Sequence, residues 1–122
     1  MDTKQTQEQI LSELNKNTCS EQYHKIPFSN IVYTDGINDL INKCSCWWLI
    51  SDTAIIISAT PKLQKDFLLL TIEVKDKKGI VTLKEDSNEK PIYEKQYDYT
   101  DFPLSKFEFY ITDNVILLKS EY

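Results

Sequence analysis

The chain contains no arginine. All fourteen of its basic residues are lysines, and nineteen acidic residues leave a net charge of −5 over 122 residues. The planar guanidinium of arginine is the group that grips phosphates and guanine edges with paired hydrogen bonds, and an acidic protein is repelled by the nucleic-acid backbone. The lysines between positions 75 and 95 alternate with Asp and Glu, which is typical of a solvated surface. The composition therefore argues against direct nucleic-acid binding.

Glycine is also scarce, with only Gly36 and Gly79 in the chain. Tight loops that point several backbone amides at one anion usually need glycine. The chain has no glycine-rich phosphate loop, no Gly-x-Ser-x-Gly nucleophile elbow and no His-Glu-x-x-His zinc motif. We therefore predict a protein that is not an enzyme and holds no cofactor.

The three cysteines are an odd number, so internal disulfides would leave one unpaired. Residues 1–7 lack the apolar segment of a secretion signal, and no run has the length and apolarity of a membrane span. We therefore predict free thiols, a cytoplasmic location and no membrane association.

The candidates for metal or nucleophilic chemistry are Cys19, His24, Cys44 and Cys46. A set of thiolates and one imidazole can bind zinc, but the Cys-x-Cys spacing at positions 44 and 46 departs from the usual Cys-x2-Cys. A nucleophilic pair of His24 with Cys19 or Cys46 needs an orienting group and an oxyanion hole, and two glycines give little material for one. We predict neither site. The alternative is a small enzyme that uses His24 with a nearby cysteine or carboxylate.

The first part of the chain carries one clear helix signal. Thr6 and Gln9 have the spacing of a capping box, which predicts a short amphipathic helix that ends near Asn17. Residues 18–30 follow as a predicted loop, and its aromatic and apolar members are expected to hold it against the domain.

Residues 33–60 form the longest nearly uncharged run and are the expected centre of the core. Thr34 and Asp35 are both good N-cap residues, because a short side-chain oxygen accepts from the free amides of a first helical turn. They predict a helix that begins near Ile37 and packs one apolar face inward.

Residues 47–58 fit two structures. Three successive isoleucines favour a strand. A helix that starts again at a Ser51 or Asp52 cap and ends before Pro61 buries the same side chains. We favour the helix over the strand.

From residue 66 onward the apolar pattern changes to a period of two, which is typical of strands. Strands are predicted over residues 67–74, 80–85, 91–99, 107–111 and 115–118, with a two-residue hairpin turn at Asp113-Asn114 before the last. The predicted fold class is α+β, with N-terminal helices packed on one face of a four- to five-stranded antiparallel meander sheet. Residues 1–122 are predicted to be a single domain, mainly helical over 1–60 and mainly strand over 66–118.

Aromatic residues are the strongest candidates for binding. Adjacent tryptophans cannot point the same way, so one of Trp47 and Trp48 is expected in the core and the other partly exposed. Tyrosines on one face of the predicted strand 91–99 either complete the core or form an outward patch of the kind found at protein interfaces. The residues predicted to contact a partner are Tyr23, His24, Trp47, Tyr97 and Tyr99.

Several segments together resemble a known family. They are Glu-Gln-Tyr-His at 21–24, Tyr-Thr-Asp-Gly at 33–36, Trp-Leu-Ile at 48–50, Tyr-Thr-Asp-Phe-Pro-Leu at 99–104 and Val-Ile-Leu-Leu-Lys-Ser-Glu-Tyr at 115–122. Over about residues 19–122 the chain is similar to an uncharacterised domain-of-unknown-function family of small bacterial, plasmid and phage proteins. The resemblance implies an α+β fold and a mobile-element setting, and it transfers no activity to any residue.

The expected function is a non-enzymatic protein-interaction module of a mobile genetic element, with inhibition of a host defence complex of the anti-CRISPR type as its role. An acidic surface can compete for a nucleic-acid groove by presenting carboxylates where phosphates bind. A homodimer that buries a sheet edge and the exposed tryptophan between subunits is a further alternative.

Overall fold

The computed structural model describes residues 6–17, 22–27, 29–85 and 90–122. The helices are α1 (Gln7–Leu14), α2 (Asp35–Cys44) and α3 (Trp47–Ala59), with short 3-10 turns η1 (Pro61–Leu63) and η2 (Lys119–Glu121). The strands are β1 (Tyr23–Lys25), β2 (Val32–Thr34), β3 (Phe67–Lys75), β4 (Lys78–Lys84), β5 (Tyr93–Tyr97), β6 (Lys106–Thr112) and β7 (Val115–Leu118).

The α+β class is confirmed, but the predicted strand count and sheet order are wrong. Within the described ranges, seven strands form one mixed sheet in the order β1-β2-β7-β6-β3-β4-β5. Strands β3, β4 and β5 make the expected antiparallel meander, but β6 then returns to pair with β3 rather than β5. The order β6-β3-β4-β5 is a Greek key, in which the fourth strand lies beside the first.

Two further strands lie in the part of the chain that was predicted to be helical or loop. β1 occupies part of the predicted loop 18–30 and pairs antiparallel with β2, which in turn runs parallel to β7. β1 and β2 are each three residues long. Such short segments carry no readable alternation of their own. They become strands because β7 supplies hydrogen-bond partners to β2, and β2 supplies them to β1.

The helix interpretation of residues 47–58 is confirmed, although α3 begins at Trp47 rather than at a Ser51 cap. Ser45 ends α2 in the left-handed conformation (φ 51°), and this bend lets a second helix start two residues later in a new direction. Along α3, Ile57 is buried while Ile55 is 57 % exposed. The successive isoleucines thus spread around the helix instead of forming a strand.

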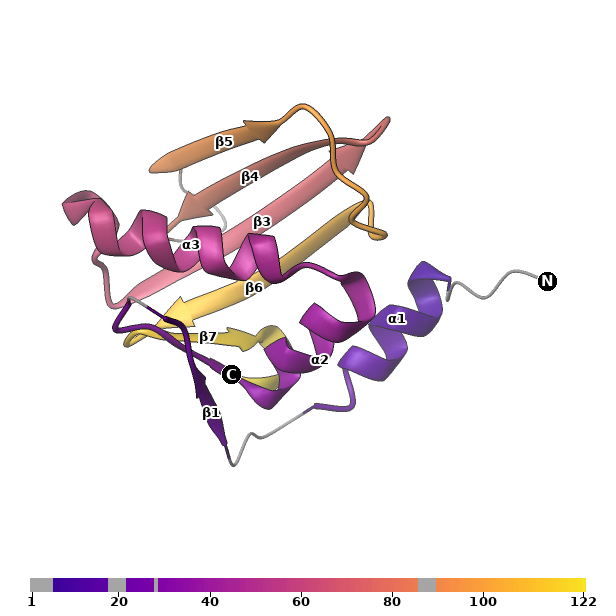
Figure 1. Cartoon of the computed structure of the whole chain (residues 1–122), viewed down its shortest axis with the longest axis horizontal. Helices are drawn as coiled ribbons and strands as arrows, with labels where there is room; N and C mark the ends of the chain where they lie inside the picture. Colours follow the sequence, from indigo (N-terminus) through magenta and orange to yellow (C-terminus); the bar gives the residue numbers. More distant parts are fainter. Residues whose placement is uncertain (1–5, 18–21, 28, 86–89) are drawn as a thin grey trace.

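The core lies between the sheet on one side and helices α2 and α3 on the other. Figure 1 shows these two helices in front of the strands. α1 lies beside α2 at one end of the sheet, so the predicted packing of all N-terminal helices on one face holds only in part. Fully buried side chains on the helix-covered face include Leu68, Leu70 and Ile72 of β3, Phe109 of β6, Ile37 and Leu40 of α2, and Leu49, Ile50 and Ala54 of α3. Burial of these apolar surfaces is the main force that holds the helices to the sheet.

Candidate functional site

A pocket of about 360 Å³ opens between α3 and the end of β5. It is lined by Trp48, Asp52, Tyr97, Tyr99, Thr100 and Asp101. Residues four apart on a helix lie on the same side, so Trp48 and Asp52 of α3 face β5 together. Tyr97 pairs with Gly79 on the helix-covered side of the sheet, and the three lining residues 99–101 follow β5 along the chain.

The inner wall of this pocket is held by a set of mutual contacts. The Tyr97 hydroxyl donates to Asp52 Oδ2 at 3.0 Å, and Lys95 Nζ lies 3.4 Å from the same oxygen. The Trp48 ring meets the Tyr97 ring edge-on with centroids 5.0 Å apart. Burial, together with the hydrogen bond to Asp52 and its negative charge, raises the pKa of the Tyr97 hydroxyl above its usual value. The phenol therefore stays a hydrogen-bond donor, and its ring has a fixed orientation.

The outer wall is exposed and carries negative charge. Tyr99 is 67 % exposed, and Lys77 Nζ lies 5.8 Å from the centre of its ring. Asp101 is also exposed, and within the part of the chain that the structure describes its carboxylate makes no ion pair. An aromatic face next to a carboxylate attracts cations, because both the ring face and the carboxylate create a negative electrostatic potential. This arrangement suits a positively charged group.

Of the other residues predicted to bind, Tyr23 and His24 lie on β1 at the opposite edge of the sheet, and Trp47 of α3 contacts the neighbouring strand β2. The His24 ring stacks on Tyr33 with centroids 5.0 Å apart, and Tyr33 meets Trp47 at 5.8 Å. His24 Nε2 lies 2.9 Å from Asp35 Oδ1. Tyr23 is 59 % exposed and Trp47 is 40 % exposed. We call His24, Tyr33 and Trp47 the β1-edge cluster.

The five residues predicted to contact a partner therefore separate into two groups. Tyr97 and Tyr99 line the pocket, whereas Tyr23, His24 and Trp47 lie at or beside the β1-edge cluster. Sequence reasoning missed Trp48, Asp52 and Asp101 as pocket residues. The four-residue spacing of Trp48 and Asp52 was a usable signal once the helix was chosen over the strand.

The thiols in the described ranges are poorly suited to chemistry. Cys44 and Cys46 are both buried and free. Burial, with the charge of Asp39 adding to it, raises the pKa of the Cys44 thiol to about 12, and burial also raises the pKa of Cys46. Cys19 lies outside the described residues. Among the described residues, no group of three or more His, Cys, Asp or Glu side chains is placed to hold a metal ion.

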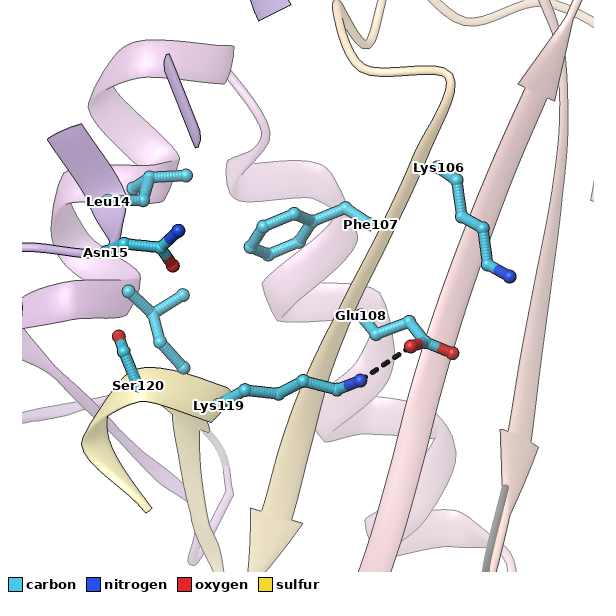
Figure 2. A pocket seen from close by; sticks show the side chains of 8 residues that line it. Leu14, Asn15, Lys106, Phe107, Glu108, Lys119 and Ser120 are labelled. Atoms are coloured by element: carbon cyan, nitrogen blue, oxygen red, sulfur yellow. Dashed lines mark hydrogen bonds and ion pairs between the residues drawn. The ribbon is translucent and has the colours of Figure 1, made fainter. Parts of the chain in front are cut away.

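A second pocket, of about 300 Å³, lies between the end of α1, β6 and η2. Figure 2 shows Phe107 pointing from β6 toward Leu14 of α1, while Lys119 reaches across to Glu108. Glu108 accepts from Lys119 Nζ at 2.6 Å and from the Thr71 hydroxyl at 2.8 Å. The Glu108 carboxylate and the Lys119 ammonium neutralise each other here, and Lys106 adds one further positive charge to the lining.

The sheet face opposite α2 and α3 carries a further set of rings. Phe67 packs against Tyr110 at 4.9 Å between ring centres, and Tyr122 meets Phe67 at 5.7 Å and Tyr110 at 5.1 Å. Both strand residues are half-buried, and Tyr122 is largely exposed. Tyr122 thus shields two strand residues from water, which accounts for these rings by packing alone.

No helix in the described ranges combines the length and apolarity that crossing a membrane requires.

Comparison with known proteins gives one match. No curated protein and no solved structure matches the chain. Residues 8–122 match the family described as a family of unknown function, DUF6876. This match covers nearly the whole chain and confirms the resemblance to a domain of unknown function, so the chain belongs to the DUF6876 family.

Proposed function

We propose that this chain is a non-enzymatic protein-binding module whose partner presents a basic surface. The observation that carries the proposal is the pocket between α3 and β5, where Trp48, Tyr97 and Tyr99 stand beside the carboxylates of Asp52 and Asp101. Tyrosine and tryptophan are enriched at protein interfaces. The net charge of −5 adds a general attraction to a basic partner.

The rigidity of the inner wall supports binding rather than packing alone. Tyr97 is tied to Asp52 and abuts Trp48, so its ring is ordered before any partner arrives. Binding to a surface that is already ordered costs less conformational entropy than binding to mobile side chains. The exposed Tyr99 at the mouth of the pocket is then free to contact the partner.

The alternative of a His/Cys-dependent enzyme has less support. His24 contacts Asp35 and Tyr33, and the buried Cys44 and Cys46 have raised thiol pKa values. A nucleophilic cysteine needs the thiolate and access to substrate. The contacts of His24 are those of a structural residue that joins β1 to the start of α2.

We extend the proposal to the mobile-element setting implied by the sequence resemblance, with inhibition of a host defence complex as the role. Complexes that hold nucleic acid do so with lysine and arginine in a positively charged groove. An acidic module with an aromatic pocket for cationic side chains is suited to such a groove and would compete with the nucleic acid for it.

Affinity capture from a host-cell lysate tests the proposal with a matched pair of variants. The wild-type chain is expected to capture a basic protein at low salt and to release it as salt is raised, because exposed charges are screened. The double variant Tyr99→Ala/Asp101→Asn is expected to lose the capture. Tyr122→Ala/Asp113→Asn makes the same chemical changes elsewhere on the surface and is expected to keep it. Capture that is the same for both double variants, or no capture by the wild type, contradicts the proposal.

A further inference from the structure

We propose that the pocket between α3 and β5 receives one cationic side chain, arginine or lysine, from the partner protein. The origin of that side chain rests on the proposed function, whereas the chemistry of the pocket does not. The volume of about 360 Å³ lies at the lower end of the range for small-ligand sites, roughly 300–1,000 Å³. The pocket therefore suits a single side chain rather than a folded segment.

The chain's own lysines show what the pocket walls attract. Lys95 Nζ lies 4.9 Å from the centre of the Tyr97 ring and 3.4 Å from Asp52 Oδ2, so a ring face and a carboxylate already hold one ammonium group together. Lys77 Nζ lies 5.8 Å from the centre of the Tyr99 ring. Both distances are within the approximate 6 Å limit for a cation–π contact.

Both charged residues that line the pocket are acidic. Asp52 is matched by Lys95, whereas the Asp101 carboxylate makes no ion pair within the described ranges. An incoming cation gains the attraction of Asp101 and of the exposed Tyr99 ring, with Trp48 packing against its aliphatic stem. A neutral side chain gains only the packing, and an acidic one is repelled by Asp101. The pocket therefore selects for positive charge.

Titration with small probes tests this without any partner. Argininamide is the cationic probe, and citrullinamide is its neutral counterpart of nearly the same shape. Binding is followed by the indole N–H signal of Trp48 in ¹H–¹⁵N NMR spectra, with Trp47, which packs on Tyr33, as the internal reference. Argininamide is expected to shift the Trp48 signal in a saturable, salt-sensitive manner and to bind roughly tenfold more tightly than citrullinamide.

Charge-matched variants locate the site. Asp101→Asn and Tyr99→Ala are each expected to weaken argininamide binding severalfold, and both positions are exposed, so the fold should survive; thermal unfolding checks this. Asp113→Asn changes the net charge equally but lies in the turn between β6 and β7, and it is expected to bind argininamide as the wild type does.

Three results would overturn the inference: equal affinity for the two probes, an unmoved Trp48 signal, or equal weakening by Asp113→Asn and Asp101→Asn. The small probes also separate this inference from the proposed function. If argininamide fails to bind while a partner is still captured, the pocket chemistry is wrong and the binding function stands. If argininamide binds as expected and no partner is captured, the cation pocket stands and the proposed function is wrong.

Discussion

The backbone amide of Gly36 donates to Glu121 Oε2 at 3.3 Å across 85 residues of sequence. The other oxygen of the same carboxylate accepts from the Thr34 hydroxyl at 2.7 Å and from the Leu118 amide at 3.0 Å. Thr34 is the N-cap of α2 and also accepts from the Ile37 amide at 3.2 Å. A carboxylate at a helix N-terminus satisfies amides that have no partner within the helix and complements the helix dipole. The C-terminal turn thus clamps the start of α2.

Replacement of Gly36 by alanine should break this clamp. A Cβ at position 36 would lie 2.6 Å from Glu121 Cδ and 2.8 Å from Leu118 Cδ1, which is closer than carbon atoms can approach. We expect Gly36→Ala to lower the free energy of unfolding by about 1–3 kcal/mol, the usual cost of overpacking, measured by urea denaturation. Gly79→Ala is the control and should cost less, because the nearest atom to its Cβ would be Thr100 Cγ2 at 3.2 Å.

A double-mutant cycle tests whether Glu121 is the side chain that a Cβ at position 36 would clash with. Glu121→Ala alone should destabilise the chain through loss of the cap, by about 0.5–2 kcal/mol. In the double variant Gly36→Ala/Glu121→Ala the new methyl group no longer meets the carboxylate, so the loss should be smaller than the sum of the single losses. Additive losses would show that the clash with Leu118, or a different effect, dominates.

Removal of the Tyr97 hydroxyl should weaken the inner wall of the pocket. Tyr97→Phe is expected to cost about 1 kcal/mol at neutral pH, because Asp52 loses a hydrogen-bond donor. The pKa of Tyr97 is raised in the folded chain, so its stabilising contribution is present below the usual value of 10.0 and is lost as the pH rises above it. The gap in unfolding free energy between wild type and variant should therefore narrow in alkali. Tyr23→Phe, at an exposed position, should show no such gap.

Acid should remove the contribution of Glu108. Partial burial alone would raise its pKa, but the hydrogen bonds from Lys119 and Thr71 and the nearby lysine charges outweigh burial and lower it. A lowered pKa means that the stabilisation is present above the ordinary value of 4.5 and is lost as the pH falls through the folded value. Glu108→Gln should thus cost about 1 kcal/mol at neutral pH, and less in acid. Urea unfolding over a pH series measures this, with the exposed Glu94→Gln as the control.

The buried thiols should resist modification in the native chain. In a Cys19→Ser background, Cys44 and Cys46 are the remaining thiols. Their burial and raised pKa values predict very slow reaction with a disulfide reagent at mildly alkaline pH, and complete reaction of both once the chain is unfolded in urea. Fast reaction of either thiol in the native protein would contradict the packing of the turn between α2 and α3.

Local signals in the sequence were reliable where a few neighbouring residues decide the structure. The capping box of Thr6 and Gln9 is present, with hydrogen bonds at 3.0 and 3.2 Å. Asp113 and Asn114 both adopt positive φ, at 50° and 64°, and join β6 to β7 as the predicted two-residue turn. Caps and tight turns depend on side chains and dihedrals within a few residues, so a single sequence reveals them.

Pairings between distant segments could not be found in this way. The chain between β5 and β6 carries nothing that distinguishes pairing with β5 from a return to β3, because both orders satisfy the same alternation of apolar residues. The pocket also depends on contacts between segments that are far apart in the sequence. Its residues come from α3 and from the end of β5, and nothing in either segment shows that they meet.

By itself, the sequence determined the fold class, the two helices near the core, the hairpins and the absence of arginine. These follow from composition, periodicity and capping, which act over a few residues. Only the tertiary structure decided the Greek key order, the added strands β1 and β2, and the meeting of Trp48 and Asp52 with Tyr97. Those features arise from burial of apolar surface between elements far apart in the chain, and many pairings of the same elements satisfy the local pattern equally well.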